Sequence, residues 1–285
     1  MGTRPEAIKM APVVRALQDA EGLEPIVVST GQHREMLQQV VDIFEIPVHF
    51  DLDVMVPNQS LAGLSARLMN KVDAFLAAEK PDFALVQGDT TTVLMAALAC
   101  FYRKIPVGHV EAGLRTGNMH SPFPEEANRR LVTPIADLHF PPTEWSAENL
   151  RKEGVAEERI TVTGNTVIDA LQIESSRHEE IATQAEVDGF VQEELGADWR
   201  EYPYVLVTGH RRENFGGGFE QICSALRALA QQFQDHRFIY PVHLNPRVRG
   251  PVMENLADLP NIFLLEPMPY RPFVALMKHA KVVLT

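Results

Sequence analysis

Short apolar runs rich in β-branched residues alternate along the chain with longer amphipathic stretches. The runs predict strands at residues 24–29, 83–86, 106–110, 136–140, 159–163, 204–207, 238–241, 262–265 and 281–285. Several stretches between them carry apolar residues at the three- and four-residue spacing of helices, most clearly 2–20, 60–78, 143–152 and 273–280. Alternation of this kind predicts an α/β fold built on doubly wound parallel sheets.

The chain is long for a single domain. With 285 residues and 45% hydrophobic content it can bury a large core, and two domains are the natural expectation. From residue 167 to about 195 the pattern becomes a long polar helix rich in Glu, Gln and His, which suits a connector better than a core element. We therefore predict an N-terminal domain at 1–166, a connecting helical segment at 167–198 and a C-terminal domain at 199–285.

Composition narrows the class of protein. No apolar run reaches the roughly 18 residues that span a bilayer, and the first residues lack the pattern of a secretion signal. The only cysteines, Cys100 and Cys223, fall in predicted apolar helices, so a soluble protein in the reducing cytoplasm is expected. The net charge of −12 disfavours a nucleic-acid partner but allows a small anionic ligand held by a local cluster of Arg and His.

Two predicted strands are each followed by a carboxylate, Asp89 and Glu111. Because right-handed crossovers bring the carboxyl ends of parallel strands to one edge, both side chains are expected at the ligand-binding edge of the sheet. The pair Glu125-Glu126 begins a further helix and brings a third acid toward the same cleft. Acids crowded in one crevice suit proton transfer, since burial and repulsion separate their pKa values. The alternatives are that Asp89 caps the following helix and that Glu125 is an ordinary first-turn charge.

Two further stretches suit a phosphate-bearing ligand. Residues 3–6 (TRPE) fit a capping box, and the helix N-terminus with Arg4 forms a predicted anion site. The stretch 208–214 places His210 and Arg211 after a predicted strand and before a run of glycines. The alternatives are a solvent-facing arginine beside a capped helix in the first case and a solvated charged loop in the second.

Several signatures of other chemistries are missing. The ten histidines show neither HxxxH nor HExxH spacing and the two cysteines lie far apart, so no metal site is predicted. The motifs GxSxG, GxxxxGK[ST] and GxGxxG are absent as well, so a hydrolase elbow, a P-loop and a dinucleotide cofactor are not expected.

Long motifs spread over the chain closely resemble those of the non-hydrolysing UDP-N-acetylglucosamine (UDP-GlcNAc) 2-epimerases. The matching stretches are GTRPEAIKMAP (2–12), QHREML (32–37), GDTTT (88–92), PVGHVEAGLRTG (106–117), SPFPEEANR (121–129), TGNTVIDAL (163–171), TGHRREN (208–214) and PVHLNP (241–246). Their length, order and coverage make the resemblance specific.

The resemblance implies two Rossmann-like domains in the GT-B-like arrangement, with the active site between them. It implies interconversion of UDP-GlcNAc and UDP-N-acetylmannosamine (UDP-ManNAc) without a cofactor, by elimination of UDP to 2-acetamidoglucal and re-addition. Two faces of C2 must exchange a proton, which explains the need for at least two carboxyl groups. UDP-GlcNAc and UDP are the implied ligands, and a homodimer is usual in the family.

Carried over by position, the resemblance assigns roles to particular residues. The implied catalytic residues are Asp89, Glu111, Glu125 and His210, the last also matching a contact to the UDP phosphates. The implied substrate-binding residues are Arg4, Lys9, Arg129 and Arg211. Bacterial members also bind an activating second UDP-GlcNAc, and the matching positions are Gln32, His33, Gln59 and His243. Glu35 and Asn58 depart from the family pattern near these positions.

The ends of the chain differ most from the family. Members begin with a hydrophobic strand before GTRPE and continue beyond the strand matching KVVLT (281–285), so an incomplete second domain and a chain truncated at both ends are expected. Two alternative functions stay open: a nucleotide-sugar binding module without turnover, and a hydrolysing 2-epimerase that releases free ManNAc and UDP.

Overall fold

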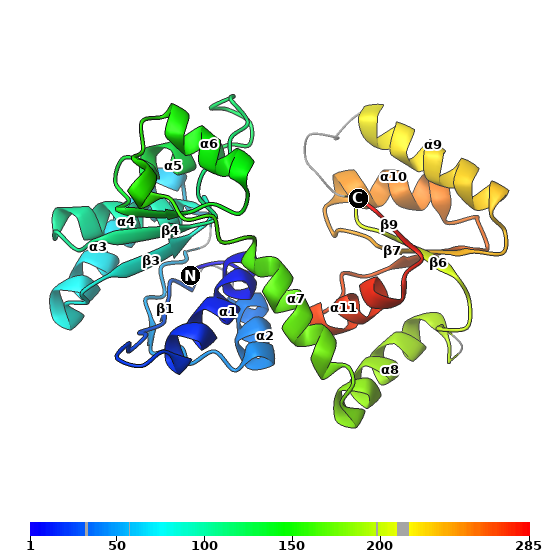
Figure 1. The fold of residues 1–285 in the computed structure, drawn as a ribbon. Helices are drawn as coiled ribbons and strands as arrows, with labels where there is room; N and C mark the ends of the chain where they lie inside the picture. Colours follow the sequence, from blue (N-terminus) through cyan, green and yellow to red (C-terminus); the bar gives the residue numbers. More distant parts are fainter. Residues whose placement is uncertain (32–33, 57, 198, 210–216) are drawn as a thin grey trace. The chain divides into compact units, whose positions relative to one another are not determined.

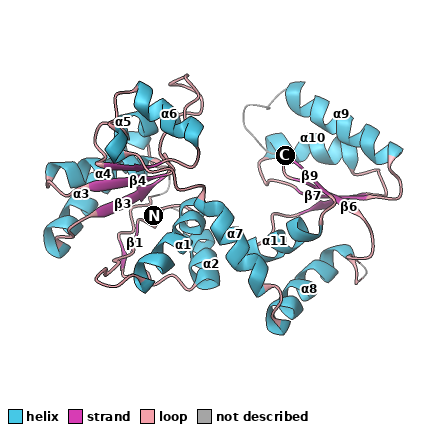
Figure 2. Cartoon of the chain, viewed as in Figure 1, coloured by secondary structure: helices cyan, strands magenta, loops and turns pink. Residues whose placement is uncertain are grey.

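The computed structural model describes the chain except residues 32–33, 57, 198 and 210–216 (Figure 1). The chain divides into two compact units, Met1–Ala170 and Leu171–Thr285. In both units helices flank parallel strands (Figure 2), so the α/β class with parallel sheets is confirmed. Among the described residues, no helix combines the length and apolar character needed to cross a bilayer.

The first unit alternates short strands with helices. Its strands are β1 (Val28–Ser29), β2 (Phe50–Asp51), β3 (Ala84–Gln87), β4 (Val107–Val110) and β5 (Leu138–Phe140). Its helices are α1 (Arg4–Asp19), α2 (Arg34–Phe44), α3 (Leu61–Glu79), α4 (Thr91–Tyr102), α5 (Glu125–Val132) and α6 (Glu144–Lys152), with the 3₁₀ turn η1 (Glu157–Arg159) and α7 (Thr166–Arg177), which runs into the second unit.

Strands β3, β4 and β5 form one parallel sheet in that order, and β1 pairs with β2. In the three-stranded sheet Gln87 is in register with Val110, so β3 and β4 end side by side. The core beside these strands is apolar, built from α3, α4, β3, β4 and the end of α5. A rigid sheet edge therefore carries the loops that follow β3 and β4.

Two strand predictions in the first unit are wrong: one strand is shorter than predicted, and the other does not form. Of residues 24–29 only Val28–Ser29 form a strand. Backbone pairing with the segment that contains β2 begins at the hydrogen bond from His49 N to Val27 O. The stretch 159–163 forms a single bridge to β5 in place of a strand. Thr161 and Thr163 donate backbone hydrogen bonds to His139 and Pro141, but Pro141 has no N–H to return the ladder.

The second unit is a four-stranded parallel sheet in the order β8-β7-β6-β9. Its strands are β6 (Tyr204–Val207), β7 (Arg237–Pro241), β8 (Ile262–Leu265) and β9 (Val282–Leu284). Its helices are α8 (Ile181–Leu195), α9 (Gly217–Gln232), α10 (Pro246–Leu256) and α11 (Tyr270–His279). Alternate strand residues face opposite layers: Leu206 packs in the cluster with α8 and α11, and Val207 packs in the cluster with α9 and α10.

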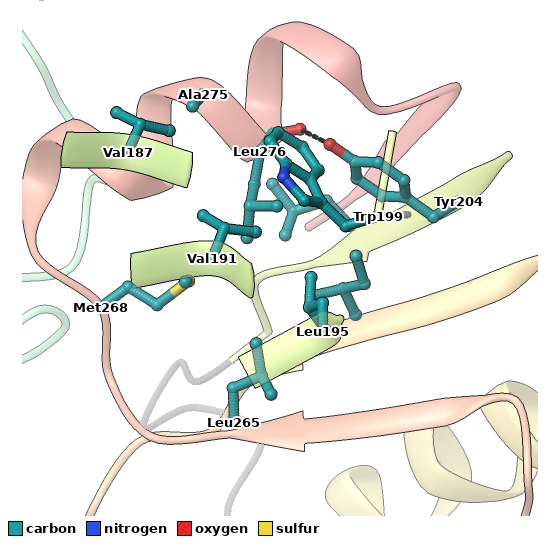
Figure 3. Close-up of a cluster of buried hydrophobic side chains, with 11 residues drawn as sticks. Val187, Val191, Leu195, Trp199, Tyr204, Leu265, Met268, Ala275 and Leu276 are labelled. Atoms are coloured by element: carbon teal, nitrogen blue, oxygen red, sulfur yellow. Dashed lines mark hydrogen bonds between the residues drawn. The ribbon is translucent and has the colours of Figure 1, made fainter. Parts of the chain in front are cut away.

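The predicted single polar helix from 167 to 195 is two helices in the structure, α7 and α8, separated at residues 178–180. Helix α8 is not a solvated connector, because Val187, Val191 and Leu195 repeat every four residues and lie buried in the core of the second unit. Figure 3 shows these side chains with Tyr204, whose hydroxyl donates a hydrogen bond to the backbone oxygen of Leu276 at 2.6 Å. In α8 the polar residues Gln184, Glu186 and 192–194 are exposed, whereas Glu174 of α7 is fully buried and paired with Arg271 at 2.8 Å.

Candidate active site

The loops after β3 and β4 carry the two acids predicted at the sheet edge. The backbone N–H of Gly88 donates to Val110 O at 3.0 Å, so the strands stay paired up to the residues just before Asp89 and Glu111. The N-cap of α4 is Thr90, whose side chain accepts from Val93 N at 3.4 Å. The alternative of Asp89 as the helix cap is therefore wrong, and its carboxylate is available to the site.

Glu111 is held firmly at this edge. Both of its carboxylate oxygens lie 2.6 Å from Lys9 Nζ, and Oε2 also accepts from Gln87 Nε2 at 2.5 Å. Its backbone has φ of +63°, a left-handed conformation that is strained for a residue with a side chain. Such strain persists only where the surroundings fix the residue, and it is found mainly at functional sites.

Asp89 lies beside several charges. Its carboxylate Oδ2 is 2.9 Å from Arg129 Nη2, and a quarter of its side chain is exposed. Burial raises the pKa of Asp89; Arg129 and Lys9 oppose the rise, whereas the nearby carboxylates of Glu111 and Glu125 add to it. The structure thus brings together all three predicted acids with Lys9 and Arg129, within the first unit.

The two acids of the pair Glu125-Glu126 have different surroundings. Glu126 is fully buried and accepts hydrogen bonds from the backbone N–H groups of Thr116 and Gly117 at 3.0 and 3.2 Å. It therefore fixes the loop that follows Glu111. Glu125, the first residue of α5, is only partly buried and lies close enough to Asp89 to raise its pKa.

The start of α1 joins the same region. Thr3 caps the helix as predicted, accepting from Glu6 N at 3.4 Å. The Glu6 carboxylate, however, does not complete the predicted capping box with the cap residue: it accepts from Gly2 N at 2.5 Å and from Thr90 Oγ1 at 2.7 Å. Glu6 is 3% exposed and links the turn before α1 to the turn before α4, while Arg4 is the first residue of α1.

The remaining predicted site residues have other printed partners or fall outside the described residues. Gln59 precedes α3, where its side chain accepts from Arg67 and contacts the sulfur of Met55. His243 lies in the second unit, exposed, with its Nδ1 accepting from Asn245 N at 3.1 Å. The predicted residues outside the described part of the chain are Gln32, His33, His210 and Arg211.

Within the described ranges, no group of three or more His, Cys, Asp or Glu side chains is arranged to hold a metal ion.

Two residues that contact the site, Asn128 and His109, were not predicted from the sequence. Asn128 Nδ2 donates to Asp89 O at 2.9 Å, and His109 Nε2 lies 2.7 Å from Gly88 O. Both act on the backbone of the turn that carries Asp89, a long-range relation that no local spacing encodes.

The raised pKa of Asp89 predicts an unusual stability effect. The folded state holds the Asp89 proton more tightly than the unfolded state does, so the free energy of unfolding falls as pH rises from the ordinary value of 3.8 through the raised value. We expect Asp89→Asn, which mimics the protonated form, to be more stable than wild type at pH 7.5, with a difference that shrinks toward pH 4. Urea unfolding at several pH values measures this, with Asp82→Asn, an exposed acid before β3, as control. A variant less stable than wild type at pH 7.5 would contradict the prediction.

Comparison with known proteins shows the family. The family model described as UDP-N-acetylglucosamine 2-epimerase matches residues 15–285. The UDP-N-acetylglucosamine 2-epimerase of Escherichia coli K12 is 50% identical over all of this chain, which spans 75% of that protein. The Yersinia pestis enzyme is 51% identical with the same coverage.

Solved structures similar to this chain come from the same family. The UDP-GlcNAc 2-epimerase from Neisseria meningitidis, bound to UDP-GlcNAc, matches 99% of this chain and 75% of its own with a TM-score of 0.90 and 44% identity. The enzyme from Methanocaldococcus jannaschii, in complex with UDP-GlcNAc and UDP, matches 99% of this chain and 76% of its own with a TM-score of 0.81 and 30% identity. The resemblance drawn from the motifs and the fold class are thereby confirmed.

Proposed function

The chain belongs to the UDP-N-acetylglucosamine 2-epimerase family, and we propose that it interconverts UDP-GlcNAc and UDP-ManNAc without hydrolysis. The observation that carries the proposal is the grouping of Asp89 and Glu111 at one sheet edge, in unequal surroundings, with Glu125 of α5 close to Asp89. Inversion at C2 needs one group that removes a proton and another that returns it on the opposite face. Glu111, paired with Lys9, and Asp89, paired with Arg129, offer two such groups.

The reaction has two halves. In the first, a carboxylate takes the C2 proton, the C2–H electron pair forms the C1=C2 double bond, and the C1–O bond breaks with its pair leaving on UDP. In the second, the UDP oxygen attacks C1 of the glucal and an acid delivers a proton to C2 from the other side. Asp89 suits the protonated role, because its raised pKa lets it hold a proton closer to neutrality than an ordinary aspartate does.

Positive groups near these acids suit the departing diphosphate. Lys9 and Arg129 reach Glu111 and Asp89 at 2.6 and 2.9 Å, and Arg4 begins the long helix α1, whose N-terminus favours anions. A cation that is paired with a carboxylate can turn to a phosphate when substrate binds. We include His210 and Arg211 in this proposal on the resemblance alone.

The direct test is product analysis. Proton and phosphorus NMR of a reaction with UDP-GlcNAc should show UDP-ManNAc appearing and reaching a constant ratio with the substrate. Free ManNAc and UDP as the only products would favour a hydrolysing enzyme. Tight binding of UDP-GlcNAc without any product would favour a binding module.

We also propose that the protein works as a cytoplasmic homodimer, as is usual for the family it resembles. Its two cysteines support a reducing setting, since both are buried as free thiols. Sedimentation equilibrium should give twice the mass of the chain, and a monomer at the enzyme concentration of the assay would contradict the proposed dimer.

A further inference from the structure

His109 is a buried polar residue in the middle of the sheet, in β4 and 1% exposed. Its Nε2 lies 2.7 Å from the backbone oxygen of Gly88. A carbonyl oxygen can only accept, so Nε2 carries the proton and the ring is the Nε2–H tautomer. Gly88 in turn is held in a left-handed conformation, with φ of +84°, directly before Asp89. The imidazole thus acts on the residue that sets the direction of the chain into Asp89.

The turn that carries Asp89 is fixed at three successive residues by three different elements. His109 of β4 donates to Gly88 O, and Asn128 of α5 donates to Asp89 O at 2.9 Å. Thr90 Oγ1 donates to Glu6 of α1 at 2.7 Å. These contacts restrain the turn on both sides of Asp89, while its carboxylate stays partly exposed.

We infer that His109 is a positioning residue for Asp89, acting through the Gly88 carbonyl, in the reaction proposed above, on which this inference rests. Proton transfer to carbon depends on the reacting groups being held within a fraction of an ångström of the productive geometry, and small misplacements are costly. A donor one strand away from the acid, buried in the sheet, supplies that constraint without touching the sugar.

The surroundings of His109 keep the ring neutral. Burial lowers the pKa of His109 to about 4, although the hydrogen bond to Gly88 opposes the change. The pKa is lowered further by nearby basic side chains, which are His139, in register on β5, and Arg115 and Arg129. A neutral ring holds one tautomer and donates the same hydrogen bond throughout the pH range in which sugar nucleotides are turned over. His109 is therefore expected to contribute no ionisation to the pH profile of kcat.

The test compares three substitutions. His109→Leu removes the donor at similar volume, His109→Gln keeps an amide N–H within reach of Gly88, and His139→Leu removes an equally buried histidine one strand away. We expect His109→Leu to lower kcat about 10- to 100-fold with KM changed less than about threefold, and His109→Gln to recover most of the loss. His139→Leu should keep kcat within about threefold of wild type. If the leucine variant does not fold, His109→Asn replaces it, because its shorter amide does not reach Gly88.

A second readout does not depend on activity. In protein with ¹³C-labelled aspartate, assigned with Asp89→Asn, the titration midpoint of the Asp89 carboxyl should move in His109→Leu and stay at its wild-type value in His109→Gln and His139→Leu. Equal loss of kcat in the leucine variants at both histidines, or an unmoved Asp89 midpoint in His109→Leu, would overturn the inference. Wild-type protein without turnover would instead overturn the proposed function, and the Asp89 titration would still decide the role of His109.

Discussion

Asp89→Asn is expected to lower the rate of UDP-ManNAc formation by about 10²- to 10⁴-fold, the usual contribution of a positioned acid or base. The amide keeps the shape of the side chain and can still face Arg129 at the 2.9 Å contact, but it neither binds nor releases a proton. Binding of UDP should change little, because the substitution removes proton transfer and not a phosphate contact. Initial rates by coupled assay and UDP binding by calorimetry measure the two effects separately.

The matched control is Asp82→Asn, which makes the same change at the opposite end of the same strand. Asp82 is exposed and precedes β3, whereas Asp89 follows it. The control should keep its full rate. Equal rates in Asp89→Asn and wild type would remove Asp89 from the mechanism, and loss of UDP binding along with rate would indicate a structural role instead.

Gly113→Ala is expected to destabilise the first unit by about 3 kcal/mol or more, because substitutions that combine backbone strain with a steric clash are among the most destabilising. Gly113 has φ of +83°, and a Cβ there would lie 2.2 Å from the backbone oxygen of Ser146 and 3.1 Å from Leu150 Cγ. Helix α6 packs directly on this glycine, since Asn149 Nδ2 donates to Gly113 O at 2.9 Å. The loop that carries Glu111 and Gly113 would have to move away from α6. Thermal or urea unfolding measures the cost.

Gly154→Ala separates the close contact from the backbone strain. Gly154 has nearly the same backbone, with φ of +87°, but a Cβ there would meet nothing within 4 Å. Its substitution should cost only about 1 kcal/mol, the price of a left-handed alanine. Equal destabilisation by the two variants would show that the contact with α6 contributes nothing.

The sequence predicted the parts of the site that depend on local pattern. Asp89 and Glu111 follow apolar runs, and the handedness of parallel crossovers was enough to bring them to one edge. The helix starting at Glu125 was predicted equally well, because paired acids after proline mark a first turn. In each case the information lies within a few residues of the position concerned.

The parts that were missed depend on contacts between distant segments. The local pattern cannot distinguish Asp89 from Thr90 as the cap of α4, because both residue types cap helices; the bond from Thr90 to Glu6, 84 positions earlier, accompanies the choice. The roles of His109 and Asn128 arise from hydrogen bonds to the turn at Asp89. Helix α8 was misjudged because three buried residues in a polar segment are enough to dock it, a weak signal in a composition-based reading.

Solvent isotope exchange at C2 tests most directly whether the three acids act on one sugar carbon. Incubation with UDP-GlcNAc in D₂O should place deuterium at C2 of UDP-ManNAc, with the incorporation lost in Asp89→Asn and retained in Asp82→Asn. Epimerised product that keeps its original C2 hydrogen, or incorporation that proceeds equally in Asp89→Asn, would contradict proton exchange by this carboxylate cluster.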